Sequence, residues 1–335
     1  MKKLIPGAYI FILTIFGCNQ RPVYKYNQIE GFAQGTTYHI TFENSTQRNY
    51  TVAIDSILKD FDMSLSEYNP NSIISRINSN DPTVEVDEHF KTVFKKSREI
   101  WEQSGGAMDI TVGPIINALG FGTSAKTVVD SANIKHLLKY IGFEKVRLEN
   151  DRIIKADTAI KLDVNSIAQG YSVDVVCNFF DSEGIDNYVV EIGGEVRAKG
   201  KNSKGLYWRI GIDKPEEGNM VPGEKLQTII SLKNQSVTTS GNYRKFYEEN
   251  GVKYSHIINP KTGSPVNSRL LSVTIVAKDC ITADGWDTPL MVLGLENSIK
   301  ILKEHPELEA LLIYTDEKGN YQDYMTDGFK SMITK

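Results

Sequence analysis

A carboxylate and a hydroxyl stand four residues apart in the run ADGWDT, residues 283–288. If the run is helical, Asp284 and Thr288 lie on one face, one turn apart. Mg²⁺ prefers such oxygen ligands and keeps water or phosphate in its other positions, so the run predicts part of a magnesium site. Helix capping by Thr282 or Asp284 is the alternative interpretation. Pro289 also removes one helical hydrogen bond and disfavours a helical conformation at Thr288.

The run KLDVNSIAQGY, residues 161–171, has the pattern of a strand that ends in a polar turn and opens a helix. The free N–H groups and the dipole at a helix N-terminus attract anions, so a phosphate site is one interpretation. Side-chain capping of the helix by Asn165 or Ser166 explains the same residues without a ligand.

Two further runs combine a polar or aromatic side chain with small or turn-forming residues. In GGAMDITVGP, residues 105–114, small residues would let a planar ligand approach the backbone, and Asp109 could accept hydrogen bonds from a ring or a ribose. A helix C-cap at the two glycines, followed by a strand, is the alternative. In SEYNPNS, residues 66–72, Tyr68 could stack on a base, although composition alone favours a surface turn.

One of the five histidines lies in YSHIINPKTGSPV, residues 254–266, which has the pattern of a strand that runs into a turn rich in Pro and Gly. An imidazole has an ordinary pKa of about 6.5 and can exchange a proton near neutral pH, so the role of His256 in chemistry depends on the groups that lie near it. A half-buried strand with a hydrogen-bonded imidazole is the simpler interpretation.

Hydrophobic spacing predicts the elements that must position these residues. Helices are expected at 49–62, at 87–104 with Asp87 as the cap, after Asn165, and within 282–304. Strands are expected at 38–42, 188–192, 207–212, 226–232, 254–258, 271–277 and 310–315. Because helices and strands do not alternate strictly, the order predicts an α+β fold with mixed sheets rather than a doubly wound parallel sheet.

The N-terminus has the pattern of an export signal. Two lysines precede a nearly all-apolar run, residues 4–16, that is too short to span a bilayer as a helix, which takes about 20 residues. The run ends in IFGC, which resembles a bacterial lipobox. We therefore expect a lipoprotein signal peptide at 1–17, diacylation of Cys18, and a tether at 18–30 that holds an exported, periplasm-facing protein at a bacterial membrane. An ordinary signal peptide is the alternative.

The composition is otherwise that of a soluble globular protein, with 40% hydrophobic residues, 24% charged residues and a net charge of −4. Because there is no basic block, we do not expect a nucleic-acid partner. Cys177 and Cys280 both lie in apolar surroundings and are expected to be small buried hydrophobic residues, although an exported chain could join them in one disulfide.

Seven runs, in the same order, resemble the ApbE family of FAD:protein FMN transferases. They are the five runs above, four of them in longer form, together with AQGTTYHI at 33–40 and EIGGEV at 191–196, and the resemblance covers about residues 31–294. The resemblance implies a T-fold-like α+β body of mainly antiparallel sheets with packed helices, over residues 31–335. It also implies an enzyme that uses Mg²⁺ to split FAD at its pyrophosphate, transfers FMN to a threonine hydroxyl of a target protein as a phosphoester, and releases AMP.

The same resemblance implies targets among membrane redox subunits, such as those of Na⁺-pumping quinone reductase or Rnf complexes. Carried over position by position, the metal ligands are the side chains of Asp284 and Thr288 and the backbone carbonyl of Ser166. The residues implied to contact FAD are Gln34, Tyr68, Ala107, Met108, Asp109, Asp163, Gln169, His256 and Ile257. His256 and Asp284 are the implied catalytic residues.

Several positions depart from the family's usual pattern. Gln34 replaces a Met, and Gln169 replaces a Lys, which removes one positive charge that could meet a phosphate. Gly285, Trp286 and Pro289 also differ from the usual residues. Two other functions therefore remain open: a metal-dependent FAD pyrophosphatase that gives FMN and AMP, and a non-catalytic FAD-binding lipoprotein.

Overall fold

The computed structural model describes residues 25–123, 131–216, 218–219, 221, 223–242, 246–249, 252–255 and 257–334. Cys18, His256, the predicted signal peptide and most of the predicted tether therefore lie outside the described residues. Among the residues that are described, no helix is long and apolar enough to cross a bilayer.

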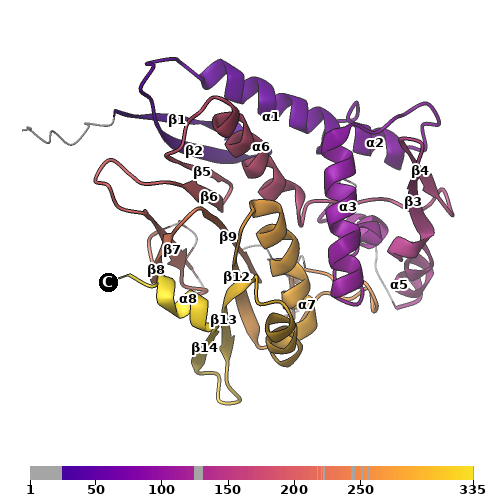
Figure 1. Cartoon of the computed structure of the whole chain (residues 1–335). Coiled ribbons are helices and arrows are strands. Elements are labelled where there is room, and N and C mark those ends of the chain that lie inside the picture. Colours follow the sequence, from indigo (N-terminus) through magenta and orange to yellow (C-terminus); the bar gives the residue numbers. More distant parts are fainter. Residues whose placement is uncertain are drawn as a thin grey trace, which may run out of the picture.

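An eight-stranded sheet runs through the molecule, and each strand is antiparallel to its neighbours (Figure 1). In spatial order its strands are β1 (Tyr26–Ala33), β2 (Thr36–Glu43), β5 (Tyr188–Ile192), β6 (Glu195–Lys199), β9 (Gln235–Gly241), β12 (Leu270–Ala277), β13 (Glu309–Thr315) and β14 (Tyr321–Met325). Three two-stranded sheets pair β3 (Val146–Glu149) with β4 (Arg152–Lys155), β7 (Trp208–Asp213) with β8 (Leu226–Leu232), and β10 (Phe246–Glu249) with β11 (Val252–Ser255).

The helices in the described residues are α1 (Thr51–Leu65), α2 (Ile73–Asn78), α3 (Glu88–Gln103), α4 (Gly113–Ala118), α5 (Ser131–Leu137), α6 (Ala168–Ser182), α7 (Cys280–Glu304) and α8 (Asp327–Met332). Helices α6 and α7 pack on the central strands of the sheet and on each other (Figure 1). The other face is covered by the β7–β8 pair and α8. This arrangement confirms the expected α+β fold.

Strand β13 shows why the sheet is apolar on both faces. Ala310 and Leu312 pack in the core on the α7 side, whereas Leu311 and Ile313 pack in the core beneath α8. Because side chains alternate along a strand, a segment buried on both faces carries an unbroken apolar run instead of an alternating one.

The structure corrects three of the sequence-based boundaries. Strand β1 begins at Tyr26, so residues 26–30 belong to the folded body and not to the tether. Helix α7 begins at Cys280 with Asp279 as its cap, not Thr282 or Asp284. The helix continues through Pro289 and breaks instead at Gly294, where φ is 75°. Cys177 and Cys280 are both buried free thiols, as expected.

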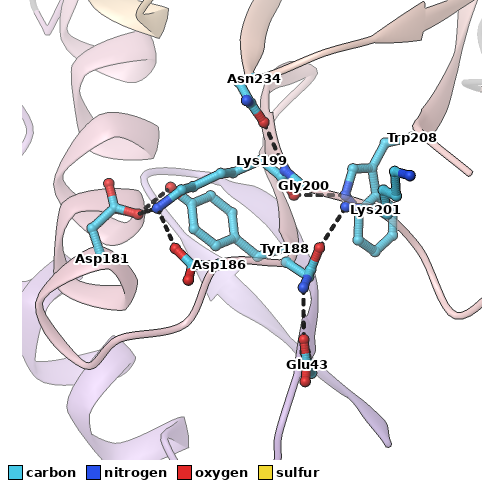
Figure 2. Close-up of polar contacts among 10 residues, drawn as sticks. Glu43, Asp181, Asp186, Tyr188, Lys199, Gly200, Lys201, Trp208 and Asn234 are labelled. Carbon is cyan, nitrogen blue, oxygen red and sulfur yellow. Dashed lines mark hydrogen bonds and ion pairs between the residues drawn. The ribbon is translucent and has the colours of Figure 1, made fainter. Parts of the chain in front are cut away.

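A polar network fixes the C-terminal half of α6 against the sheet (Figure 2). Lys199 of β6 donates to Asp181 at 3.0 Å and to Asp186 at 2.8 Å, and the Tyr188 hydroxyl donates to Asp181 at 2.9 Å. The network involves Asp181, near the C-terminal end of α6, and none of the residues of its first turn.

Candidate active site

Helices α6 and α7 cap each other where their first turns meet. Oδ2 of Asp284, on α7, accepts from the Gly170 N–H of α6 at 2.7 Å. In return, Asp174 of α6 accepts from the N–H groups of Cys280 at 3.0 Å and Ile281 at 2.8 Å. A carboxylate at a helix N-terminus satisfies free donors and complements the helix dipole, so each helix stabilises the other.

At α6, the contact with Asp284 takes the place of the local capping that the sequence left open as an alternative. No side chain of its own segment caps α6, so capping by Asn165 or Ser166 is wrong. The contact with Asp284 also leaves fewer free N–H groups at the start of α6 for an anion. Ala168 donates to the Val164 carbonyl at 2.9 Å and Gly170 donates to Asp284, which leaves the Gln169 N–H without a backbone acceptor in the described part of the chain.

The helix contact depends on the missing side chain of Gly170. A Cβ atom at this position would lie 2.5 Å from the Asp284 Cβ and 2.5 Å from the Cys280 carbonyl oxygen. Both distances are far below van der Waals contact. The site therefore requires a glycine because of space between the helices, not because of backbone conformation.

The three implied metal ligands belong to the two segments that this contact joins. Asp284 and Thr288 are one turn apart on α7, and the Ser166 carbonyl belongs to the turn that leads into α6. The Thr288 hydroxyl lies 3.3 Å from Ser240 Oγ on β9 and donates to Asp287 Oδ1 at 3.2 Å. Thus α7, β9 and the α6 turn together position the predicted oxygen ligands.

Three carboxyl groups with raised pKa values, those of Asp284, Asp287 and Glu195, lie close together at the site. Burial raises the pKa of Asp284 to about 7; the Gly170 N–H opposes this rise and the Asp174 charge adds to it. Burial also raises the pKa of Asp287 and Glu195 well above the usual range, and the Asp284 charge raises both further. Glu195 Oε2 is buried with no hydrogen-bond partner in the described residues.

This donor set fits a hard divalent cation, which binds carboxylate, hydroxyl and carbonyl oxygens and favours the ionised form of nearby carboxyls. In the described ranges, no three or more acidic, His or Cys side chains converge on one metal position. A bound cation would therefore need the Thr288 hydroxyl and the Ser166 carbonyl as well as Asp284.

The two glutamines that depart from the usual pattern lie beside the first turn of α6. Gln34 occupies the two-residue turn between β1 and β2 with φ of 54°, and its Oε1 accepts from Ser172 Oγ at 3.1 Å. Its Nε2 is buried and has no partner among the described residues. Gln169 Nε2 donates to the Ile192 carbonyl at 3.3 Å, so of the two amide nitrogens it is that of Gln34 that has no acceptor among the described residues.

Asp163 and Glu67 form a pair of carboxyl groups near the start of the turn that leads into α6. The buried Asp163 accepts from the Asn165 N–H at 3.0 Å and is hydrogen bonded to Glu67. Glu67 also accepts from the Val164 N–H and from Asn165 Nδ2, each at 3.3 Å. Burial, and then the Asp163 charge, raises the pKa of Glu67 to about 9. The two carboxyls therefore share a proton.

The sequence profile of the ApbE family matches residues 34–312, which is most of the chain. The chain belongs to the ApbE family.

Relatives and solved structures agree with this assignment. The FAD:protein FMN transferase of Vibrio cholerae is 35% identical, over 98% of this chain and 98% of the relative. That of Haemophilus influenzae is 34% identical, over 94% of each. The structure of the flavin transferase ApbE from Vibrio cholerae superimposes with a TM-score of 0.83 at 34% identity, covering 92% of this chain and 99% of that chain. The ApbE protein of Thermotoga maritima gives 0.80 at 28% identity, covering 93% and 100%.

The remaining residues implied by the ApbE resemblance have mixed surroundings. Tyr68 is 68% exposed beside Glu67, so its ring is accessible. Ala107 and Met108 are buried, as is Ile257, which packs in the main core. Any contact of these three with FAD would have to come largely from the backbone.

The carboxylate of Asp109 already accepts three hydrogen bonds. Its Oδ1 accepts from the Thr111 N–H at 2.9 Å and from the Thr111 hydroxyl at 2.6 Å, and its Oδ2 accepts from the Phe143 N–H at 3.0 Å. It lines a cavity of about 630 Å³ together with Trp101 and Lys261. Because three donors already use its oxygens, Asp109 shapes this cavity, and a ring or ribose donor would have to use the remaining acceptor position of Oδ2.

Sequence reasoning missed Glu67, Asp174, Glu195, Arg197 and Asp287 as parts of the site. All five stand inside or beside runs that the sequence singled out, but no local spacing distinguishes them from charged surface residues. Their importance depends on burial and on contacts with distant segments.

The shared proton predicts a specific pH dependence of stability. The native chain keeps this proton, whereas an unfolded Glu loses it above about pH 4.5, so the free energy of unfolding should fall as pH rises from about 4.5 toward 9. Glu67→Gln keeps a hydrogen-bonding side chain but cannot ionise, and we expect it to flatten this decline. Urea unfolding at a series of pH values measures the effect, with Glu224→Gln at an exposed position as the control. An unchanged slope in Glu67→Gln would show that the pair does not share a proton.

Proposed function

We propose that this ApbE-family chain transfers FMN from FAD to a threonine hydroxyl of a target protein and releases AMP, in a Mg²⁺-dependent reaction. The main support is the hydrogen bond between Asp284 and Gly170, because it unites the predicted metal-binding run and the predicted phosphate-binding turn across 114 residues of sequence. The names of the relatives provide the flavin donor and the protein acceptor.

The residues that would hold Mg²⁺ are Asp284, Thr288 and the Ser166 carbonyl, with Asp287 and Glu195 as further buried carboxyls beside them. Bound Mg²⁺ supplies charge stabilisation to a pyrophosphate at which negative charge builds up. The chain itself holds these segments together through the α6–α7 contact, and Gln34, which is hydrogen bonded to Ser172 of α6, has an amide nitrogen with no partner among the described residues.

In the proposed reaction, the threonine oxygen forms a bond to the phosphorus on the flavin side of FAD. The bond from that phosphorus to the bridging oxygen breaks, and AMP leaves with the electron pair. The threonine proton must pass to a base, and His256, which lies outside the described residues, is the proposed acceptor.

Replacing His256 by glutamine tests this role. General base catalysis typically contributes about 10²–10⁴-fold in rate, so we expect His256→Gln to slow FMN transfer by at least about 100-fold. The Michaelis constant for FAD should change little if the imidazole acts only on the acceptor. Single-turnover transfer to an acceptor domain measures the rate, and transfer at the normal rate would remove His256 from the mechanism.

The function itself is tested by incubating the chain with FAD, Mg²⁺ and a small domain that bears an acceptor threonine. We expect an acceptor mass increase equal to the added FMN phosphoester, with one AMP per modified acceptor, and no modification when that threonine is replaced by alanine. Free FMN with an unmodified acceptor would instead identify a pyrophosphatase. Bound but intact FAD would identify a non-catalytic binding protein.

We also propose that the mature chain is anchored through acylated Cys18, since the lipobox-like run supports it. The seven-residue step from Cys18 to Lys25 spans at most about 25 Å when fully extended. The catalytic body would then stay close to the bilayer, which suits a membrane-bound redox subunit as the target. Mass spectrometry of the N-terminal peptide, with Cys18→Ser as the unanchored control, tests the anchor.

A further inference from the structure

We infer that Asp174 is a positioning residue for the metal site, which it holds in place through the N-terminus of α7; this inference rests on the proposed function. Asp174 does not belong to the implied ligand set, and its hydrogen bonds go to Arg197, Cys280 and Ile281 and not to Asp284. Its influence runs through the helix on which Asp284 and Thr288 stand.

Every oxygen of the Asp174 carboxylate is used to join elements. Oδ1 accepts from the Cys280 N–H at 3.0 Å and from Arg197 Nη1 at 2.6 Å, and Oδ2 accepts from the Ile281 N–H at 2.8 Å. The residue is 4% exposed. One buried carboxylate therefore connects α6, the first turn of α7 and strand β6.

On each of the two helices, the residues that make the contacts are four positions apart. On α6, Gly170 and Asp174 are one turn apart; on α7, Cys280 and Asp284 are one turn apart. Asp174 meets the start of α7, and Asp284 meets the start of α6. Loss of the first contact frees two buried N–H groups and lets the first turn of α7 shift, which moves Asp284 away from Gly170.

Arg197 makes this arrangement electrostatically possible. Its guanidinium lies beside Asp174, so the negative charge of Asp174 is balanced within the contact and does not add fully to that of the neighbouring Asp284. Partners that orient metal ligands are worth about 10–100-fold in metal affinity when they are removed. We therefore expect the effect of Asp174 to appear first in metal binding.

The test compares Asp174→Asn with Asp181→Asn, the same change on the same helix but within the network of Figure 2. Mn²⁺ binding, followed by electron paramagnetic resonance, measures affinity without turnover. We expect Asp174→Asn to weaken Mn²⁺ binding at least tenfold and Asp181→Asn to leave it unchanged. FMN transfer by Asp174→Asn should recover at high Mg²⁺, with a near-normal Michaelis constant for FAD.

If Asp174→Asn does not fold, as judged by circular dichroism, Arg197→Lys decides the question, because it keeps Asp174 but replaces its planar partner. We expect a weaker loss of Mn²⁺ affinity in that variant. If the variant that folds binds Mn²⁺ as tightly as the unchanged chain, the inference is wrong, and the proposed function is not affected. Absence of Mn²⁺ binding by the unchanged chain would overturn the proposed metal site, and the inference with it.

Discussion

Replacing Asp284 by alanine should abolish FMN transfer while the chain stays folded. Asp284 supplies the only carboxylate of the implied metal-ligand set. Removal of one electrostatic group that acts on the transition state typically lowers the rate by about 10²–10³-fold, and loss of the cation itself would lower it further. The effect on stability should be small, because loss of the helix cap costs about 1 kcal/mol, whereas removal of a buried carboxyl relieves a desolvation penalty.

The experiment measures AMP release together with the melting temperature. Asp284→Asn is the matched variant, since its carbonyl oxygen can still accept from the Gly170 N–H while the charge is lost. We expect both variants to be inactive and to melt within a few degrees of the unchanged chain. More than a tenth of normal activity in Asp284→Ala would show that this carboxylate is not the metal ligand.

Replacing Gly170 by alanine should damage both the site and the fold. The new methyl group would lie 2.5 Å from Asp284 Cβ and from the Cys280 carbonyl oxygen, so α6 and α7 must move apart. Overpacking of this kind typically costs about 1–3 kcal/mol. The displacement also breaks the contact that holds Asp284, so we expect Mn²⁺ affinity and FMN transfer to fall by at least tenfold.

Gly184→Ala is the control, because it should lose about as much stability as Gly170→Ala without disturbing the contact between α6 and α7. Gly184 follows the C-terminal end of α6, has φ of 73°, and has no atom within 4 Å of an added Cβ. Alanine there should cost about 1–2 kcal/mol through backbone strain alone. Equal losses of Mn²⁺ affinity in the two variants would mean that general destabilisation, and not the helix contact, controls the site.

Local sequence patterns predicted the elements that carry the site but not the contacts between them. The spacing of Asp284 and Thr288 correctly placed both on one helix, and the turn before Gly170 correctly opened another. The capping assignments were wrong for two reasons: α7 begins earlier, with Asp279 as its cap, and the N-terminal turn of α6 receives the carboxylate of Asp284 from α7. Pairing of residues more than 100 positions apart leaves no periodic signal in either segment.

Other elements were missed for a different physical reason. Strand β1 (Tyr26–Ala33) is an edge strand in which only Ile29 is buried, so its sequence lacks the alternation that marks a strand. Glu67 is half-buried and stands between a helix end and a polar turn, so no sequence pattern marks it as an acid with a raised pKa. Hydrophobic spacing and element order predicted the α+β class, and resemblance to the ApbE family added the mainly antiparallel body.

The reciprocal contacts between α6 and α7 also bear on the order in which the protein folds. They join residues separated by 106, 107 and 114 positions, so a long loop must close before any of them forms. No smaller fragment that lacks either helix can assemble the site. Catalytic competence should therefore arise late in refolding, after most secondary structure is present, and its appearance would time the completion of the native topology.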